Sequence, residues 1–277
     1  MRKKNIRAAT IVKWWFLLTL LLIQVVPLTQ LLFNSFRTDA EIKKFPIGLP
    51  TQLHWENYAE TWVVGEYGQA FLNSFFIGFV DIAIVLCCSG LGAYALSKME
   101  FRGKNFLTAY FLLAISIPGF LYIVPVFFIF TRLNLTNGHL GLILIYAAME
   151  IPFNLLLIRT FLLGIPKELE EAAEVDGCTQ FKAFVRIIVP LAKPIFMTVA
   201  LLVFLRTWNE FLWANTFLQA DELRTVATRF VKFTSEWSSD FSRIFTAGVI
   251  SIAPIVVLYL FLQRYFVEGL TSGSVKG

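Results

Sequence analysis

Residues 71–96 read FLNSFFIGFVDIAIVLCCSGLGAYAL, and Asp81 is the one charged residue in this stretch. A helix needs about 20 mostly apolar residues to cross the roughly 30 Å of hydrocarbon in a bilayer. The stretch is long enough and apolar enough to meet that requirement. It therefore predicts a transmembrane helix.

Five further apolar blocks lie on either side of this one, at about 14–33, 106–130, 140–161, 195–212 and 245–266. The whole chain of 277 residues is 57% hydrophobic and 16% charged, whereas a soluble domain has roughly 25% charged residues. The six blocks cover about half of the chain, and no low-complexity linker divides them. We expect an all-α, polytopic membrane protein with six transmembrane helices, forming a single membrane domain over residues 1–277.

The first block follows the basic residues Arg2, Lys3, Lys4, Arg7 and Lys13, as a secretory signal would. It is about 20 residues long, and no small-residue cleavage site follows it, so we expect an uncleaved span. With the N-terminus inside, fifteen Lys and Arg residues fall on the cytoplasmic side and eight on the outer side. This bias predicts that both termini are cytoplasmic.

The segment between the fourth and fifth blocks, residues 162–190, carries a second signal. Its part 163–177 reads LGIPKELEEAAEVDG. Pro166 suits the start of a helix, the glutamates suit its positive end, and Gly177 suits the left-handed residue that ends it. Thr179 can cap a second helix, and Pro190 limits that helix. The pattern predicts a helix, a glycine turn and a second helix on the cytoplasmic surface.

One side of the first of these helices is formed by Leu169, Ala172 and Ala173. Their small volume would let the helix backbone lie in a groove of another protein. The same pattern also fits an amphipathic helix on the inner surface of any membrane protein.

A resemblance to a known family rests on the same residues. Glu171-Ala172-Ala173, three residues, Gly177, nine residues and Ile187-Ile188-Val189-Pro190 together resemble the EAA loop of ABC importer permeases, E-A-A, x3, G, x9, I-x-L-P. Val189 in place of Leu is the one departure. The C-terminal residues 263–277 are similar to the tail of carbohydrate-importer permeases of the maltose-permease G type. Shorter similarities lie at 208–211 (WNEF), 56–58 (ENY) and 73–74 (NS).

The resemblance implies a permease subunit of a sugar importer of the bacterial plasma, or inner, membrane. Such a subunit translocates a sugar, here an oligosaccharide, by alternating access. It works with a second homologous permease, two cytoplasmic ATP-binding subunits and an extracytoplasmic sugar-binding protein. Membrane lipid is expected around it, and nucleic acid is not a partner. This chain has no G-x-x-x-x-G-K-[ST] phosphate loop. We therefore expect no enzyme activity and no cofactor here, because partners bind ATP and Mg²⁺.

The resemblance also assigns residues to the contact with the ATPase. In the loop these are Glu171, Ala172, Ala173, Gly177, Cys178 and Pro190. In the cytoplasmic tail, residues 267–277, they are Glu268, Gly269, Gly273 and Lys276.

Ionisable residues inside membrane helices are costly and mark candidate functional sites. Arg206 and Glu210 lie one helical turn apart, so we expect them to neutralise each other. For Glu150, lining of the pore and structural pairing both stay open. The candidates for the substrate path are Asp81, Tyr122, Glu150, Asn154, Trp208, Asn209, Glu210 and Trp213. The aromatic ones also suit anchoring at the membrane interface. Pro118, Pro125 and Pro254 predict kinks that shape a cavity.

A secondary transporter or a channel is the alternative class, since it too can have six spans. It would not need the helix, glycine and helix loop, and it would place coupling charges at the midplane. His54 and His139 are the chain's two histidines, and no metal site is predicted. Oligosaccharides, monosaccharides and glycerol phosphate all fit the pattern as substrates.

Overall fold

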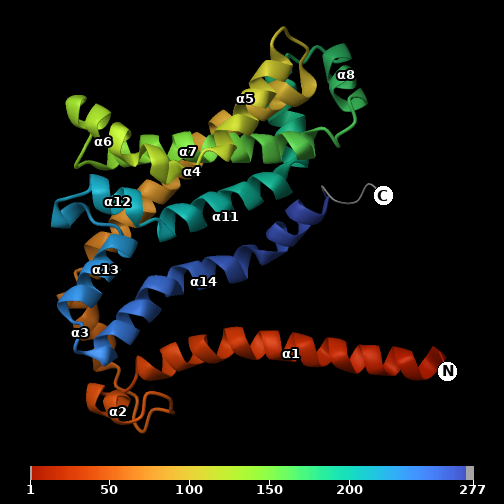
Figure 1. Ribbon diagram of the computed structural model, residues 1–277. Coiled ribbons are helices and arrows are strands. Elements are labelled where there is room, and N and C mark those ends of the chain that lie inside the picture. Colours follow the sequence, from red (N-terminus) through yellow and green to blue (C-terminus); the bar gives the residue numbers. More distant parts are fainter. Residues whose placement is uncertain (1, 273–277) are drawn as a thin grey trace. The chain divides into compact units, whose positions relative to one another are not determined.

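The structure is a computed structural model that describes the backbone of residues 2–272 and the side chains of residues 10–261 and 263 (Figure 1). Every regular element in that part of the chain is a helix, which confirms the all-α class. The chain forms two compact units. The first contains residues up to Tyr67 and Arg229–Ala253, and the second contains Gly68–Thr228 and the residues from Pro254 onward.

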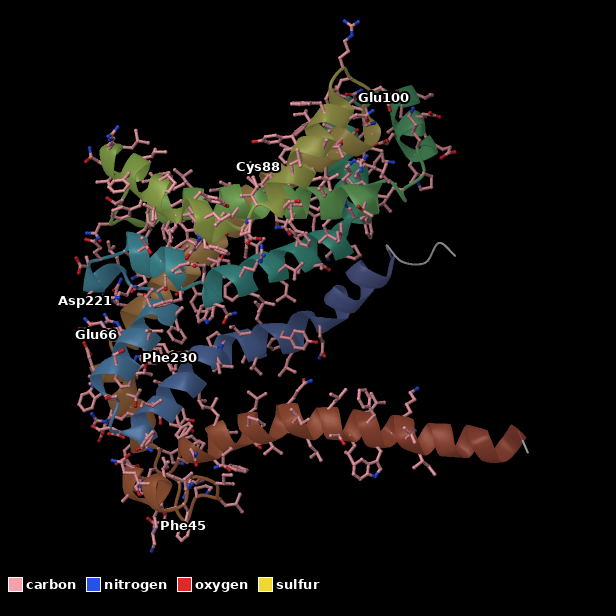
Figure 2. All side chains as sticks on the ribbon, in the orientation of Figure 1. Phe45, Glu66, Cys88, Glu100, Asp221 and Phe230 are labelled. Atoms are coloured by element: carbon pink, nitrogen blue, oxygen red, sulfur yellow. The ribbon has the colours of Figure 1, made fainter. Side chains whose placement is uncertain are left out.

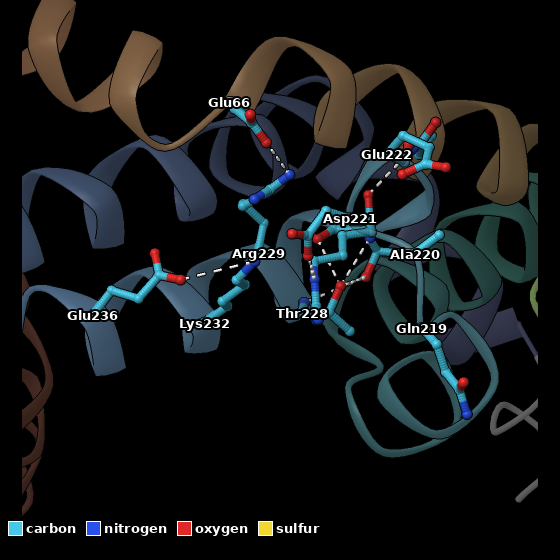
Figure 3. Close-up of polar contacts among 12 residues, drawn as sticks. Glu66, Gln219, Ala220, Asp221, Glu222, Thr228, Arg229, Lys232 and Glu236 are labelled. Carbon is cyan, nitrogen blue, oxygen red and sulfur yellow. Dashed lines mark hydrogen bonds and ion pairs between the residues drawn. The ribbon is translucent and has the colours of Figure 1, made fainter.

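The first unit joins two long helices through short ones. Its elements are α1 (Arg2–Asn34), α2 (Asp39–Lys44), α3 (Glu56–Val64), most of α13 (Val226–Glu236) and the first part of α14 (Phe241–Ser272). The side chain of Asn57 on α3 donates to the carbonyl oxygens of Ser35 and Arg37 at 3.0 and 3.1 Å. Arg229 on α13 forms an ion pair with Glu66 at 2.5 Å (Figure 3). These polar contacts hold the end of α1 against α3 and α13 against the end of α3.

The start of the helix α2 is fixed by hydrogen bonds between Thr38 and Glu41. The hydroxyl of Thr38 accepts from the backbone nitrogen of Glu41 at 3.3 Å, and the Glu41 carboxylate accepts from the nitrogen of Thr38 at 3.1 Å. This reciprocal capping box satisfies two backbone donors that would otherwise lack partners. The hydroxyl of Thr51 also donates to Glu41 and lowers the pKa of that carboxyl. Glu41 therefore stays charged at neutral pH and ties the following connection to α2.

The second unit holds the remaining helices. They are α4 (Tyr67–Lys98), α5 (Lys104–Ser116), η1 (Gly119–Tyr122), α6 (Ile123–Arg132), α7 (His139–Leu162), α8 (Glu168–Val175), α9 (Gln180–Ala183), η2 (Phe184–Ile188), α10 (Val189–Leu191), α11 (Lys193–Asn209), α12 (Leu212–Phe217), η3 (Asp221–Leu223) and the end of α14. Residues of α4, α7 and α11 form one buried apolar cluster, with Val85, Ile158 and Val199 fully covered. A second cluster joins α7 to α12 around Leu142 and Phe217.

Four helical stretches of the described chain are long and apolar enough to cross a membrane: Thr10–Asn34, Tyr67–Lys98, His139–Leu162 and Phe241–Phe261. Two bent pairs, Lys104–Ser116 with Gly119–Arg132 and Gln180–Leu191 with Lys193–Asn209, bring the number to as many as six. The predicted first, second, fourth and sixth spans are thus single helices. The predicted third and fifth spans need correction.

The third block, 106–130, is not one straight helix. Its two halves meet at an angle of 87°. Ile117 and Pro118 adopt extended backbone conformations, with ψ of 115° and 126°. A residue before proline is sterically disfavoured in the helical region, and proline cannot donate the next hydrogen bond. The predicted kink at Pro118 is confirmed, and it is large enough to break the helix.

The ends of the last two spans also differ from the prediction. The fifth helix, α11, ends at Asn209 rather than at residue 212, because Glu210 is extended (ψ 122°), and the next helix begins at Leu212. The sixth, α14, continues past residue 266 to Ser272, so the predicted tail begins as helix. Glu268 and Gly269 lie in that helix, whereas Gly273 and Lys276 lie outside the described residues.

Candidate functional site

The loop between α7 and α11 has the predicted helix, glycine and helix order. Gly177 has a φ of +76°, the left-handed value that closes α8. The backbone nitrogen of Gly177 donates to the carbonyl oxygen of Glu174 at 3.0 Å, and that of Cys178 donates to Ala173 at 2.9 Å. These two bonds make a Schellman motif, which satisfies carbonyls at the end of the helix. The hydroxyl of Thr179 then accepts from the nitrogen of Lys182 at 3.3 Å and caps α9.

This loop is fastened to the end of α4, which is in turn bonded to the end of α7. Lys98, the last residue of α4, donates to the carbonyl oxygen of Ile165 at 2.6 Å, and its Nζ lies 3.8 Å from the Glu170 carboxylate. Arg159 near the end of α7 donates to the carbonyl oxygen of Leu96 at 3.1 Å. Both cations sit where the helix dipole favours positive charge. Through these contacts α8, α4 and α7 are joined at one end of the second unit.

A cavity of about 300 Å³ lies between α8 and the end of α4. Its walls are mostly charged, and Glu170, at 7% exposure, is the most deeply buried carboxylate among them. The lining residues are Tyr94, Lys98, Met99, Glu100, Lys167, Glu170, Glu171, Glu174 and Gln180. Sequence inspection missed Glu170 and Lys98 as a pair, because they are 72 positions apart in the chain.

The accessible side of α8 differs from the expected one. Ala173 is 4% exposed, because α9 packs against α8 and covers it. Large apolar side chains that stay exposed in the loop include Leu169, as expected, together with Val175 and Phe181, and Val175 is 88% exposed. Ala172 lies on the exposed side as predicted, and Glu171 and Pro190 are also exposed. The open face of the loop, which we call the α8 face, therefore consists of Leu169, Ala172, Val175 and Phe181.

A polar cluster lies inside the second unit, between α4, α7 and α11. Glu150 on α7 accepts a hydrogen bond from the guanidinium of Arg206 on α11 at 2.8 Å. The side-chain nitrogen of Asn154 donates to the carbonyl oxygen of Glu150 at 2.8 Å and to its carboxylate at 3.2 Å. The predicted pairing of Arg206 with Glu210 is thus wrong. Arg206 takes a partner from another helix, since α11 bends away from helical geometry at Glu210.

Glu210 has a different task in this structure. Its carboxylate accepts from the backbone nitrogens of Trp213 and Ala214, both at 2.9 Å, and so caps the start of α12. It also accepts from the hydroxyl of Tyr146 on α7 at 2.6 Å. A carboxylate at a helix N-terminus is favoured by the free backbone donors there. Glu210 therefore links α7, α11 and α12.

Asp81 is fully buried on α4. One carboxylate oxygen accepts from the hydroxyl of Thr207 on α11 at 2.9 Å, and the other has no hydrogen-bond partner within the described residues. The partner that the sequence left unnamed is therefore Thr207. Nothing in the sequence pointed to it, because the two residues come from different helices.

The remaining predicted path residues divide by exposure. Trp208 and Trp213 are each 3% exposed and pack in aromatic clusters, and Asn154 is fully buried. Tyr122 packs on Trp213 with ring centroids 5.7 Å apart and stays partly exposed. Asn209 is exposed at the end of α11. The side chain of Arg206 is 63% exposed, so the Glu150 pair opens to one side of the chain.

Long apolar helices, a polar cluster between them and a helix, glycine and helix loop are the features of a membrane-spanning subunit. A family model described as a binding-protein-dependent transport system inner membrane component matches residues 89–272, more than half of the chain. The chain belongs to this family of ABC transporter permeases. Members are membrane components and not enzymes.

Curated relatives match over most of their length. A probable ABC transporter permease protein of Bacillus subtilis, YurM, is 38% identical over 95% of this chain and 88% of its own. The arabinooligosaccharides transport system permease protein AraQ of Halalkalibacterium halodurans is 34% identical over 92% of each chain. A chain in the crystal structure of a bacterial ABC transporter that imports the acidic polysaccharide alginate has a TM-score of 0.82, with 24% identity over 94% of this chain and 97% of its own. That likeness shows the fold.

Proposed function

We propose that this chain is the permease subunit of an ATP-driven importer of an oligosaccharide, and that the α8 face docks on a cytoplasmic ATPase subunit. The observation that carries the proposal is the α8 loop. It is closed by a Schellman motif, fastened to α4 through Lys98, and open on one apolar face. A secondary transporter would have no use for such a loop.

The substrate class is supported by the relatives. Those named for arabinooligosaccharides, for diacetylchitobiose and for trehalose are 34%, 32% and 31% identical to this chain. Each covers more than nine tenths of it. All three relatives are named for short oligosaccharides. We extend that class to this chain.

The mechanism that follows is alternating access driven from α8. Docking holds α8 as a rigid body, and its displacement reaches α7 and α11, which carry Glu150 and Arg206. Moving a two-state equilibrium from 1:99 to 99:1 needs about 5.5 kcal/mol of differential binding. ATP bound between the partner subunits supplies this energy. Among the path candidates, Asn209 and Tyr122 are accessible enough to contact sugar, and Glu150 is connected to the accessible side through Arg206. The buried candidates do not contact the sugar and instead hold the helices that carry the path in place. They are Asp81, Asn154, Trp208 and Trp213.

The proposed assembly contains a second homologous permease, two ATP-binding subunits and an extracytoplasmic sugar-binding protein. Both termini are placed in the cytoplasm, where the tail, residues 267–277, meets the ATPase subunits. The lysine and arginine bias of the sequence supports this orientation.

A cysteine reporter tests both docking and orientation. Cys178 is partly covered, so we suggest Val175→Cys in a chain whose three cysteines are replaced by serine. An impermeant maleimide should label this variant in inside-out vesicles and not in intact cells, and the purified ATPase should protect it. Gln219→Cys, exposed in the connection after α12, is the control and should be labelled from the other side. Labelling of Val175→Cys from outside would refute the orientation, and a lack of protection would refute the docking.

A further inference from the structure

The connection between α2 and α3 carries large apolar side chains that nothing in its own unit covers. We call residues 45–49, with the sequence FPIGL, the apolar loop. Phe45, Ile47 and Leu49 are 60%, 81% and 70% exposed, and Phe45 lies beside α2 in Figure 2. Connections that face water are usually built from small and polar residues. Three large apolar side chains in five positions therefore require a cover.

Hydrogen bonds fix the apolar loop beside the end of α1. The side chain of Gln30 donates to the carbonyl oxygen of Gly48 at 3.1 Å and accepts from its nitrogen at 3.4 Å. The side chain of Asn34 donates to the carbonyl oxygen of Pro46 at 3.2 Å. Gln30 lies four residues before Asn34, about 6 Å further into the helix. The loop thus turns back along the last turn of the membrane-crossing stretch Thr10–Asn34.

The same contacts explain how two amides can stand at the end of an apolar helix. Gln30 also donates to the side-chain oxygen of Asn34 at 2.8 Å. Arg37, 4% exposed, donates to that oxygen at 2.8 Å and to the carbonyl oxygen of Glu41 at 3.0 Å. Burying an amide without a partner is costly. Satisfying Gln30 and Asn34 with the loop backbone removes that cost and sets the depth of the loop.

The side chains of the loop point away from these bonds. Pro46 and Gly48 bond to α1 through backbone atoms, and the neighbouring side chains of Phe45, Ile47 and Leu49 stay exposed. No residue in the most apolar window of α1 is buried. Val26, one turn before Gln30 on the same side of α1, is 53% exposed. The loop and the end of α1 to which it is bonded thus both carry exposed apolar side chains.

A basic residue completes the pattern. The Nζ of Lys44, an exposed residue, lies 5.5 Å from the centroid of the Phe45 ring. Its neighbour Lys43 is engaged by Asp39 and by the carbonyl oxygen of Ser239. A lysine whose stem rests on an apolar surface can extend its ammonium to lipid phosphates. The charge lies beside the apolar surface, as at a membrane–water interface.

We propose that the apolar loop is an interfacial anchor that inserts Phe45, Ile47 and Leu49 into the lipid leaflet around the Asn34 end of α1, with Lys44 at the phosphate level. Amphipathic segments of this kind are held by buried apolar area and by attraction to anionic headgroups. The anchor fixes the depth of α1 in the bilayer. The anchor can form in either orientation of the chain. The proposal is therefore independent of the proposed docking of an ATPase.

The test places a fluorophore at Ile47. Ile47→Cys, in a chain whose three native cysteines are serine, is labelled with the environment-sensitive nitrobenzoxadiazole group. The assembled transporter is put into nanodiscs of phosphatidylethanolamine and phosphatidylglycerol. We expect a blue-shifted emission, quenching by phospholipid that carries a nitroxide near the start of its acyl chain, and loss of quenching by iodide. Gln52→Cys, exposed in the same connection, is the control and should show the reverse.

Two outcomes would overturn the anchor. Iodide quenching at Ile47 equal to that at Gln52 would place the loop in water. Insensitivity to both quenchers would mean that a protein, such as the second permease or a binding protein, covers the loop. Leu49→Cys supplies a second probe if the first variant does not assemble. Adding Gln30→Leu, which removes both bonds to Gly48, should shift the Ile47 emission to the red, because the loop loses its depth.

Discussion

Thr207 is the single hydrogen-bond partner that the described residues give to the buried carboxylate of Asp81. Leaving a buried acceptor without its donor costs about 1–3 kcal/mol. We therefore expect Thr207→Val, which keeps the side-chain shape, to lower the free energy of unfolding by about that amount. The purified complex should then show a lower melting temperature. Thr207→Ser keeps the hydroxyl and should be close to the parent. Equal melting temperatures for the valine and serine variants would show that the bond contributes nothing.

The Glu150–Arg206 pair permits a double-mutant cycle. Removing one partner of a buried pair leaves an uncompensated charge, and Glu150 is the buried member, at 9% side-chain exposure against 63% for Arg206. Arg206→Gln should therefore lower stability, and adding Glu150→Gln to it should restore much of the loss. The measurement is the melting temperature of all four forms. Strictly additive effects would argue against direct pairing.

The partners of these ionisable residues could not be predicted from the sequence. The sequence identified Asp81, Glu150, Arg206 and Glu210 as unusual, because ionisable residues are rare in apolar helices. It paired Arg206 with Glu210, because spacing along one chain reveals only local neighbours. The observed partner is on another helix, 56 positions away. Which helix faces which is set by packing of α4, α7 and α11, and a single sequence does not carry that information.

Among the elements, the glycine and threonine signals of the α8 loop were predictable, since they act through local backbone geometry. Pro190, which was expected to limit the second helix, lies inside α10 (Val189–Leu191), so that part of the prediction is wrong. The left-handed Gly177 and the cap at Thr179 were both expected and are confirmed. The 87° break of the third span was only partly foreseen. Pro118 indicated a kink locally, but the hydropathy of the block does not give the direction in which the helix bends. The angle depends on what the two halves pack against.

Gly177 gives the sharpest test of this element. No atom outside its neighbours lies within 4 Å of a side chain built there, so a substitution acts through the backbone alone. A β-branched residue in the left-handed region costs about 1–2 kcal/mol. We expect Gly177→Val to distort the end of α8 and to reduce the amount of ATPase that co-purifies with the permease. Gly177→Asn, which tolerates that conformation, should retain it. Equal amounts of co-purified ATPase with both variants would show that the conformation of Gly177 is not needed for docking.

At the scale of the whole molecule, the sequence predicted a helical membrane protein correctly, because apolar blocks of this length have one physical use. It did not predict two compact units. Their boundary crosses α14 between Ala253 and Pro254, where the composition does not change.

The C-terminal tail is tested on the whole assembly. Residues 271–277 include two glycines and lie beyond the predicted sixth span. Deleting them should leave membrane insertion intact and reduce recovery of the ATPase subunits with the permease. A chain in which a glycine and serine stretch of the same length replaces them is the control for length, and it should behave like the deletion. Full recovery with either change would mean that the tail is only a terminus.

The exposed guanidinium of Arg206 has a consequence for how a cell manufactures this subunit. A cation on a membrane helix is tolerated beside water or polar atoms and is costly against lipid. A chain newly delivered to the membrane, before assembly, carries that cation on its open side. We expect orphan chains of this subunit to be removed by membrane proteolysis until a partner covers the Arg206 side of α11.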